Sequence, residues 1–558
     1  MMDAATQVPM MPTGAAQPPQ WRDAPTLAIL LLAMTALYLA LHVGCWMPGT
    51  DAQYYIDIAR SVALGRGYQI NGGPAKLVPP LWPMVLGGAM RLSSSYAYLH
   101  LLPTALALLA VANWYRVLRR FAPPGRAALV VATAGMLWWG YYSATALISE
   151  ALFMALFSSA LVLAVALAQG RWAWWRLVML ALLCGAMVLT RFTGLIAWLL
   201  VGAVLLSGPI SPRQRLLGVL VSGAVTVGVF AATQSYLLPR LLPSTIQNPA
   251  PWVADSASAE TDESLSVVPT EKAALGLRLL SAGRWLSGLL WMPTELGVAS
   301  GALAQAVNLV GWLLIALLGV AVWRGTQNRQ WIWLAVLLYC GLLCARWRAP
   351  NARYLLPVAP MLILAIWKGI ESLLSPATAR TLVGLWLGSV LLCNVALYAV
   401  DLYIARAGDY YANYYAGHGQ DLVAMSHYLR SAELRDGQLA VSARYRNLNR
   451  SRKNGFGLRA MRVLCDRLVR QVPSSVCDGP PNAALAQWAA KAQVRYYLYR
   501  PPASPWRVWH FRMPGVQKLL TGQQQVVPSP FWVLYELRGR EFVEVAVPPV
   551  AWGPRGVF

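Results

Sequence analysis

The sequence predicts a polytopic α-helical membrane protein of about eleven transmembrane helices, followed by a small extracytoplasmic α/β domain. Three observations predict this class. The chain of 558 residues is 57% hydrophobic and 12% charged, which excludes an ordinary soluble globular protein. Apolar runs long enough to cross roughly 30 Å of hydrocarbon recur along residues 25–403. Residues 404–558 instead have ordinary polarity, turn residues and strand-like stretches such as VRYYLYR.

The expected spans follow directly from the apolar runs. They lie at about 25–46, 96–115, 127–147, 150–169, 174–190, 194–208, 216–238, 302–323, 331–345, 354–372 and 380–400. Residues 1–24 are rich in Pro, Ala and Gln and lack the pattern of a cleaved signal peptide. We therefore expect a disordered cytoplasmic tail before an uncleaved first span.

The net charge of +24 does not by itself indicate nucleic-acid binding. Part of the excess of Lys and Arg over Asp and Glu lies in short loops between apolar runs. Lysine and arginine gather in the cytoplasmic loops of membrane proteins. With the N-terminus in the cytoplasm, these basic loops fall inside. The loop 49–92, a second large loop at 239–300 and the C-terminal domain then fall outside.

Two features of the C-terminal domain allow more than one interpretation. Its basic segment 442–471 is either a solvated face resting on anionic lipid head groups or a docking surface for an acidic acceptor. Cys465 and Cys477 could form a disulfide in an oxidising compartment. No Cys/His spacing in the chain resembles a zinc site, so we predict no metal.

Acidic residues are rare in the first half of the chain, where Asp51, Asp57 and Glu150 are the only ones between Pro25 and Leu238. The predicted topology puts all three at the external membrane edge, and ionisable groups near the membrane tend to mark function. The structural alternatives are a helix cap for Asp51 and a favourable helix-dipole position for Glu150. Asp51 and Asp57 are six residues apart and cannot share a helix face.

The loop 49–92 is rich in glycine and proline, and its apolar stretch LWPMVLGGAMRL is too short to cross the membrane. We expect its helices to lie along the membrane surface and to cover a lipid-borne substrate. Tyr54, Lys76 and Trp82 are candidate substrate-binding residues of this loop. Trp82 is a candidate for stacking on a sugar or a prenyl chain, although most tryptophans of such proteins lie at the membrane interface.

Seven short motifs occur in a characteristic order: DAQYY, ARSVALGRGY, PPLWP, RRF, LISEALF, TRFTGL and ARYLLPVAP. In this order the chain resembles bacterial integral-membrane glycosyltransferases of the C superfamily. In particular it is similar to glycosyltransferase family 39, which contains protein O-mannosyltransferases and the lipid A aminoarabinose transferase. The resemblance covers roughly residues 25–210 and 345–372.

The resemblance implies a bacterial inner-membrane enzyme that takes a sugar from a polyprenyl-phosphate donor and uses no cofactor. The matching catalytic acids are Asp51, in the first external loop, and Glu150. A carboxylate would take the acceptor's proton, cations would stabilise the departing phosphate, and single displacement would invert the sugar. The candidate substrate-binding residues on the external side are Lys76, Arg191, Arg346, Arg353 and Tyr354. Anchoring at the membrane interface is the alternative role for these cations.

Two other classes of function compete with a glycosyltransferase. A multi-span transporter or flippase of a lipid-linked or anionic substrate would have a similar composition, but we find no second copy of the DAQYY to PPLWP block. A noncatalytic scaffold that binds acidic polymers is the third class. The sequence does not identify the sugar, nor whether the acceptor is a glycan, a lipid or a protein.

Overall fold

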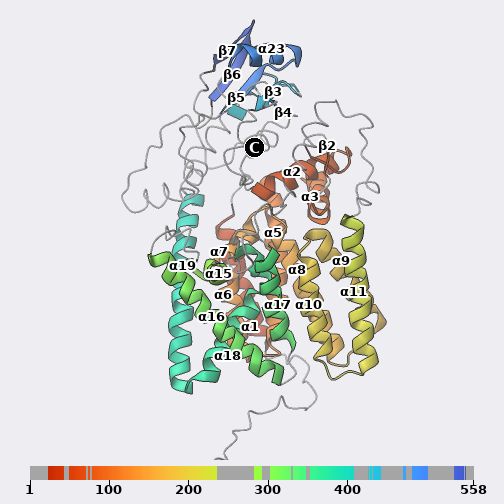
Figure 1. The fold of residues 1–558 in the computed structure, drawn as a ribbon, viewed down its shortest axis with the longest axis vertical. Coiled ribbons are helices and arrows are strands. Elements are labelled where there is room, and N and C mark those ends of the chain that lie inside the picture. Colours follow the sequence, from red (N-terminus) through yellow and green to blue (C-terminus); the bar gives the residue numbers. More distant parts are fainter. Residues whose placement is uncertain are drawn as a thin grey trace, which may run out of the picture.

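The computed structural model describes most of the membrane region and part of the C-terminal region. The described ranges are 23–42, 50–70, 73–75, 78–234, 282–291, 302–327, 331–346, 352–406, 425–426, 428–429, 431–435, 437–441, 469–472, 481–499, 533–545 and 547. These residues form a bundle of long helices with a small sheet at one end (Figure 1).

The bundle contains two runs of helices. The first run is α1 (Ala24–Ala40), α4 (Tyr96–Leu99), α5 (Leu101–Leu118), α6 (Pro124–Met136), α7 (Trp138–Thr145), α8 (Glu150–Ala168), α9 (Trp174–Thr190), α10 (Gly194–Leu206) and α11 (Pro212–Gln234). The second run is α15 (Ala282–Trp291), α16 (Ala302–Gln327), α17 (Trp331–Arg346), the 3-10 helix η2 (Ala352–Val358), α18 (Ala359–Leu373) and α19 (Pro376–Arg406). Each apolar run of the sequence is therefore largely helical.

One predicted span, at 127–147, is broken into α6 and α7. The break lies at Leu137, whose backbone is extended, with φ −54° and ψ 144°. Gly140 permits the sharp turn, because a Cβ there would lie 2.6 Å from the carbonyl oxygen of Ala134. Hydropathy alone does not reveal such a break, since both halves are apolar.

The structure does not confirm the predicted count of eleven spans. Within the described part of the chain, six helices are long and apolar enough to cross a membrane. Four further apolar helices have 10–17 residues: Ala24–Ala40, Trp174–Thr190, Gly194–Leu206 and Trp331–Cys344. The polytopic helical class is confirmed, whereas the count of eleven is not.

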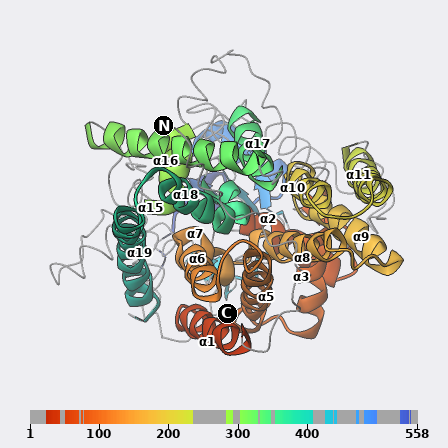
Figure 2. The ribbon, with the colours of Figure 1, turned by 90° about the horizontal axis from the view of Figure 1, so that it is seen from below.

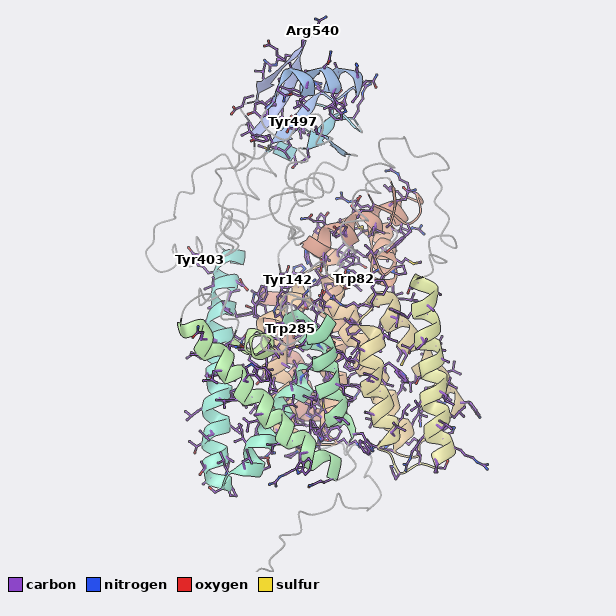
Figure 3. The ribbon with its side chains drawn as sticks, in the orientation of Figure 1. Trp82, Tyr142, Trp285, Tyr403, Tyr497 and Arg540 are labelled. Atoms are coloured by element: carbon purple, nitrogen blue, oxygen red, sulfur yellow. The ribbon has the colours of Figure 1, made fainter. Side chains whose placement is uncertain are left out.

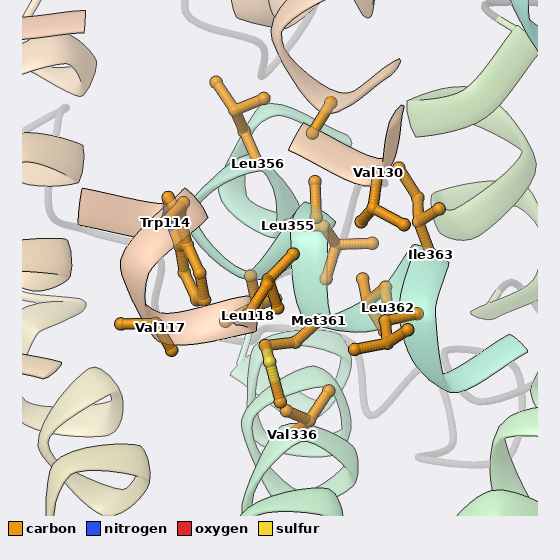
Figure 4. Packing of buried hydrophobic residues seen from close by; sticks show 14 of the residues in the cluster. Trp114, Val117, Leu118, Val130, Val336, Leu355, Leu356, Met361, Leu362 and Ile363 are labelled. Carbon is orange, nitrogen blue, oxygen red and sulfur yellow. The ribbon is translucent and has the colours of Figure 1, made fainter. Parts of the chain in front are cut away.

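α18 lies in the middle of the bundle and packs against α5, α6, α16, α17 and α19, as the end-on view shows (Figure 2). Its residues Met361, Leu362 and Ile363 are buried, and they lie close to Trp114 of α5 and Val336 of α17 (Figure 4). Inside a membrane such side chains stabilise the bundle through close packing against neighbouring helices. This core fixes the position of the η2–α18 segment.

The loop 49–92 forms two helices, α2 (Thr50–Ala63) and α3 (Leu81–Leu92), joined by the short strands β1 (Gln69–Ile70) and β2 (Gly73–Pro74). Both helices lie at the end of the bundle nearer the sheet (Figure 1). They pack closely at Gly87: a Cβ at this position would lie only 2.8 Å from the Ala59 carbonyl oxygen, so the contact requires glycine. The helices expected in this loop are present.

The C-terminal region is the predicted α/β domain, with a five-stranded sheet of order β4-β3-β5-β6-β7. The elements are β3 (Leu439–Val441), β4 (Val469–Gln471), α23 (Ala483–Lys491), β5 (Tyr496–Tyr499), β6 (Val533–Arg538) and β7 (Glu541–Glu544). β3 pairs in parallel with β4 and β5, and the other pairs are antiparallel. Tyr497 lies inside this domain and Arg540 at its far tip (Figure 3). Cys465, Cys477 and most of the basic segment lie outside the described residues.

Candidate functional site

Four charged residues meet at the end of the bundle that α2 covers. Glu150 opens α8, Arg191 follows the last residue of α9, and Arg353 lies in η2 just before α18. Because successive helices run in opposite directions, the start of α8, the end of α9 and the start of α18 are at the same end. Asp51, in the first turn of α2, completes the group.

α2 is held over this end by contacts that surround Asp51. Ala52 packs against Ala146 and Ile148 in the segment that leads into α8. The hydroxyl of Tyr55, one helical turn after Asp51, shares a hydrogen bond of 3.0 Å with the Ser149 hydroxyl. The first turn of α2 is therefore fixed directly beside the start of α8.

The four charged side chains form an alternating chain of acids and arginines. Arg353 Nη2 lies 2.5 Å from Asp51 Oδ2, and Arg353 Nε lies 3.5 Å from Glu150 Oε1. Glu150 also pairs with the second arginine: Arg191 Nη1 lies 2.5 Å from Glu150 Oε1. Two carboxylates thus balance two guanidinium groups, and Glu150 bridges both arginines.

The ring of Tyr354 contacts the guanidinium groups of both arginines. The guanidinium carbons of Arg191 and Arg353 lie 5.0 and 5.2 Å from the centre of its ring. Such cation–π contacts strengthen where water is excluded. The Tyr339 hydroxyl donates a hydrogen bond of 2.9 Å to the Tyr354 carbonyl oxygen, which fixes the backbone of η2.

Ser149 and Tyr55 belong to the site although the sequence did not single them out. Arg191 Nη1 donates a hydrogen bond of 3.0 Å to Ser149 Oγ, which also contacts the Tyr55 hydroxyl. Their positions could have indicated this role, since Ser149 precedes Glu150 and Tyr55 lies four residues after Asp51. Both are buried.

Exposure separates the two carboxylates. The side chain of Asp51 is 28% exposed, whereas that of Glu150 is 3% exposed. The two arginines lie between them, at 12% for Arg353 and 11% for Arg191. Asp51 is therefore accessible to solvent, while Glu150 is enclosed by its arginine partners.

The electrostatics of the site favour the charged forms of the arginines. Burial alone would lower the pKa of the Arg191 guanidinium, but the charge of Glu150 more than offsets this effect, and the pKa lies above its ordinary value. Burial and then the charge of Asp51 raise the pKa of Tyr55 above its usual range. Tyr55 is therefore a neutral hydrogen-bonding group at any physiological pH.

Not every residue predicted for the site contributes to it. Trp82 is completely buried, and its indole donates a hydrogen bond of 3.4 Å to the Leu147 carbonyl oxygen. With 0% exposure it offers no face for stacking on a substrate, so the expectation of a stacking residue is replaced by a core role. Trp82 lies near the end of the bundle that α2 covers (Figure 3).

The remaining candidates are Tyr54, Lys76 and Arg346. Tyr54 is half-buried and packs against Ile58, Tyr68 and Ile70 in a small cluster of the loop. Lys76 lies outside the described residues. Arg346 is the last residue of α17, and its side chain is likewise not described. Within the ranges that the structure covers, no group of three or more His, Cys, Asp or Glu side chains could hold a metal ion.

Comparisons with known proteins find a likeness only among solved structures. No protein-family model and no curated protein sequence matches the chain. The chain is similar to the archaeal oligosaccharyltransferase AglB from Archaeoglobus fulgidus in complex with an inhibitory peptide and a dolichol-phosphate, with 12% identity, a TM-score of 0.45 and coverage of 86% of this chain and 70% of that one. The Archaeoglobus fulgidus oligosaccharyltransferase in the apo form gives a TM-score of 0.49 at the same identity and coverage.

A second group of similar structures is ArnT from Cupriavidus metallidurans. The form bound to undecaprenyl phosphate has 14% identity and a TM-score of 0.46, with coverage of 92% of this chain and 98% of that one. With TM-scores below 0.5 and identities of 14% or less, these likenesses do not establish an activity for the chain.

Proposed function

We propose that this protein is a glycosyltransferase that moves a sugar from a polyprenyl-phosphate donor to an acceptor on the extracytoplasmic side of the bacterial inner membrane. The observation that carries the proposal is the pairing of a reachable carboxylate, Asp51, with an enclosed arginine pair at one end of an apolar bundle. A lipid-linked phosphate has its charged group at the membrane edge, where this end of the bundle is expected to lie. The resemblance to glycosyltransferase family 39 supports the same donor class.

The chemistry needs one base and one anion-binding group. In the proposed step, Asp51 accepts a proton from the acceptor, and the acceptor atom attacks the anomeric carbon of the sugar. The bond from that carbon to the phosphate oxygen breaks, and the electron pair stays on the phosphate. Arg353 and Arg191 stabilise the resulting charge, because guanidinium groups bind phosphate oxygens through paired N–H donors. Attack opposite the leaving phosphate inverts the anomeric centre.

Glu150 takes a different role from Asp51 in this proposal. Its carboxylate is enclosed and touches both arginines, so it is a positioning residue that holds them together. From the sequence alone, both acids are predicted to be catalytic. The difference in exposure favours Asp51 alone as the group that meets the acceptor.

Mass spectrometry of surface glycolipids and glycoproteins tests the proposal. Cells lacking this protein are complemented with wild type, Asp51→Asn or Glu371→Gln at matched expression. Glu371 pairs with Arg126 through α18 and α6, away from the site, and provides the matched loss of one carboxylate. We expect wild type and Glu371→Gln to restore a defined sugar mass and Asp51→Asn to fail. Full restoration by Asp51→Asn would exclude Asp51 as the base.

A transporter or flippase makes a different prediction in the same cells. The lipid-linked sugar would be moved without being consumed, and purified protein would release no polyprenyl phosphate from it. Release of polyprenyl phosphate together with a glycosylated product, in a reconstituted system, supports transfer over transport.

A further inference from the structure

Asp51 and Arg353 form an ion pair with each other. The proposed reaction, however, needs Asp51 free to accept a proton and Arg353 free to bind phosphate. Arg353 Nη2 lies 2.5 Å from Asp51 Oδ2. A carboxylate bound to a guanidinium is a poor proton acceptor, because protonation gives up the attraction between the two charges. The same contact also occupies one of the donors that would bind phosphate. Each partner therefore blocks the function of the other.

We propose that Asp51 and the phosphate of the donor compete for Arg353, so that phosphate binding releases the carboxylate that acts as the base. This inference rests on the proposed function and adds its regulation. It couples two events: the base becomes available only when a donor phosphate is in place.

Three features of the site make Arg353 the arginine that exchanges partners. Its Nε lies 3.5 Å from Glu150 Oε1, and its guanidinium lies over the Tyr354 ring. Arg353 therefore keeps two supports when Asp51 leaves. Asp51 is the more exposed partner, at 28%, and can move toward solvent.

Arg191 lacks this freedom. Its Nη1 contacts both Glu150, which is 3% exposed, and the Ser149 hydroxyl at 3.0 Å. Displacing Glu150 from Arg191 would leave a buried carboxylate with only its longer contact to Arg353, which is unfavourable. Arg191 therefore contributes a fixed positive charge, and Arg353 contributes the exchangeable contact.

Charge balance gives the exchange its driving force. Asp51 and Glu150 together balance the two arginines. A phosphodiester that entered without displacing a carboxylate would add an unbalanced negative charge to a partly enclosed site. When it displaces Asp51, each arginine again has an anionic partner, and the displaced carboxylate lies next to the acceptor side.

The exchange also predicts how the product leaves. After transfer, the polyprenyl phosphate carries an additional negative charge and remains on Arg353. The return of Asp51 to Arg353 then assists release of the lipid. A variant without the Asp51 charge should retain the product.

Binding of undecaprenyl phosphate to the purified full-length protein in detergent tests the exchange. We compare wild type, Asp51→Asn, the double variant Asp51→Asn/Arg353→Gln and the control Glu371→Gln by titration and by dissociation rate. If Asp51 occupies Arg353 about 90% of the time in the unloaded site, Asp51→Asn should bind about tenfold more tightly and release the lipid more slowly. The gain should vanish in the double variant, and Glu371→Gln should match wild type.

The outcomes separate this inference from the proposed function. If wild type and Asp51→Asn bind the lipid equally, or if Asp51→Asn binds more weakly, the exchange is wrong while the donor class stands. If neither protein binds undecaprenyl phosphate, the proposed donor class itself is wrong. Should the double variant fail to fold, Asp51→Asn/Arg353→Lys replaces it. That variant keeps the charge but lacks the paired donors, so it should lose most of the gain, and an undiminished gain would contradict the role of Arg353.

Discussion

The buried position of Glu150 leads to a quantitative prediction for Glu150→Gln. This change keeps the shape of the side chain and removes the charge that faces Arg191 at 2.5 Å and Arg353 at 3.5 Å. Two enclosed guanidinium groups would then share one remaining carboxylate. Removing one partner of a buried ion pair typically costs about 3–5 kcal/mol, because the remaining charge is left without compensation.

Glu371→Gln is the matched comparison, since it removes the same charge from another arginine pair. Glu371 lies 2.8 Å from Arg126, and the two side chains are 33% and 28% exposed. Pairs with such access to solvent contribute about 0–1 kcal/mol. The amide oxygen introduced by Glu371→Gln would still accept the hydrogen bond that the Trp367 indole donates at 2.9 Å. The two substitutions thus differ mainly in how well water can replace the lost partner.

Thermal unfolding of the purified full-length variants, followed by tryptophan fluorescence in one detergent and at one scan rate, compares the two losses. We expect Glu150→Gln to lower the midpoint by at least three times as much as Glu371→Gln. Undecaprenyl phosphate should recover part of the loss in Glu150→Gln, because an anion supplies the missing charge. Equal midpoints for the two variants would refute the reasoning that the arginine pair depends on Glu150.

Three further predictions concern other parts of the structure. Ser149→Ala removes the hydroxyl that Arg191 contacts. Loss of this hydrogen bond, worth about 1 kcal/mol, should lower kcat/KM severalfold, mainly by raising KM for the donor. An unchanged KM would exclude a positioning role for Ser149. Gly311→Ala places a Cβ against the backbone of Gly283 where α15 and α16 cross and should lower the unfolding midpoint, whereas Gly319→Ala on the same helix meets nothing within 4 Å and should not. For Glu536, burial raises the pKa, but hydrogen bonds from two arginines lower it more, so the folded pKa lies below its ordinary 4.5. Its stabilising contribution is complete above about pH 4.5 and is lost as the pH falls through the lower folded pKa; hydrogen exchange in β6 should show this loss, and Glu536→Gln should abolish it.

Much of the fold could be predicted because hydropathy reports it directly. The apolar runs became helices, and the polar C-terminal region became a domain with a mixed sheet. The count of spans could not be read in the same way. α10, for example, has 13 residues in the structure, and the run at 127–147 divides at Leu137. Where a helix ends or breaks inside an apolar run depends on packing against its neighbours.

The candidate site could be predicted in composition but not in pairing. The topology brought Asp51, Glu150, Arg191 and Arg353 to one end, as the sequence suggested. Which acid meets which arginine depends on side-chain positions that no local pattern encodes. Trp82 shows the same limit, because only the packing of α2 on α3 determines that its ring faces inward.

The ion-pair network of Asp51, Arg353, Glu150 and Arg191 also affects the helices that carry these residues. α8 is apolar all round, so hydrophobicity alone does not fix its rotation about its own axis against neighbours and lipid. Glu150, at the first residue of α8, contacts arginines from the end of α9 and from η2. These contacts are directional and favour one rotation of α8 relative to α9 and η2. The network that we propose to bind phosphate therefore also sets the register of the bundle end, which explains why its inner members, Glu150 and Arg191, have to remain paired while Asp51 at the edge can exchange.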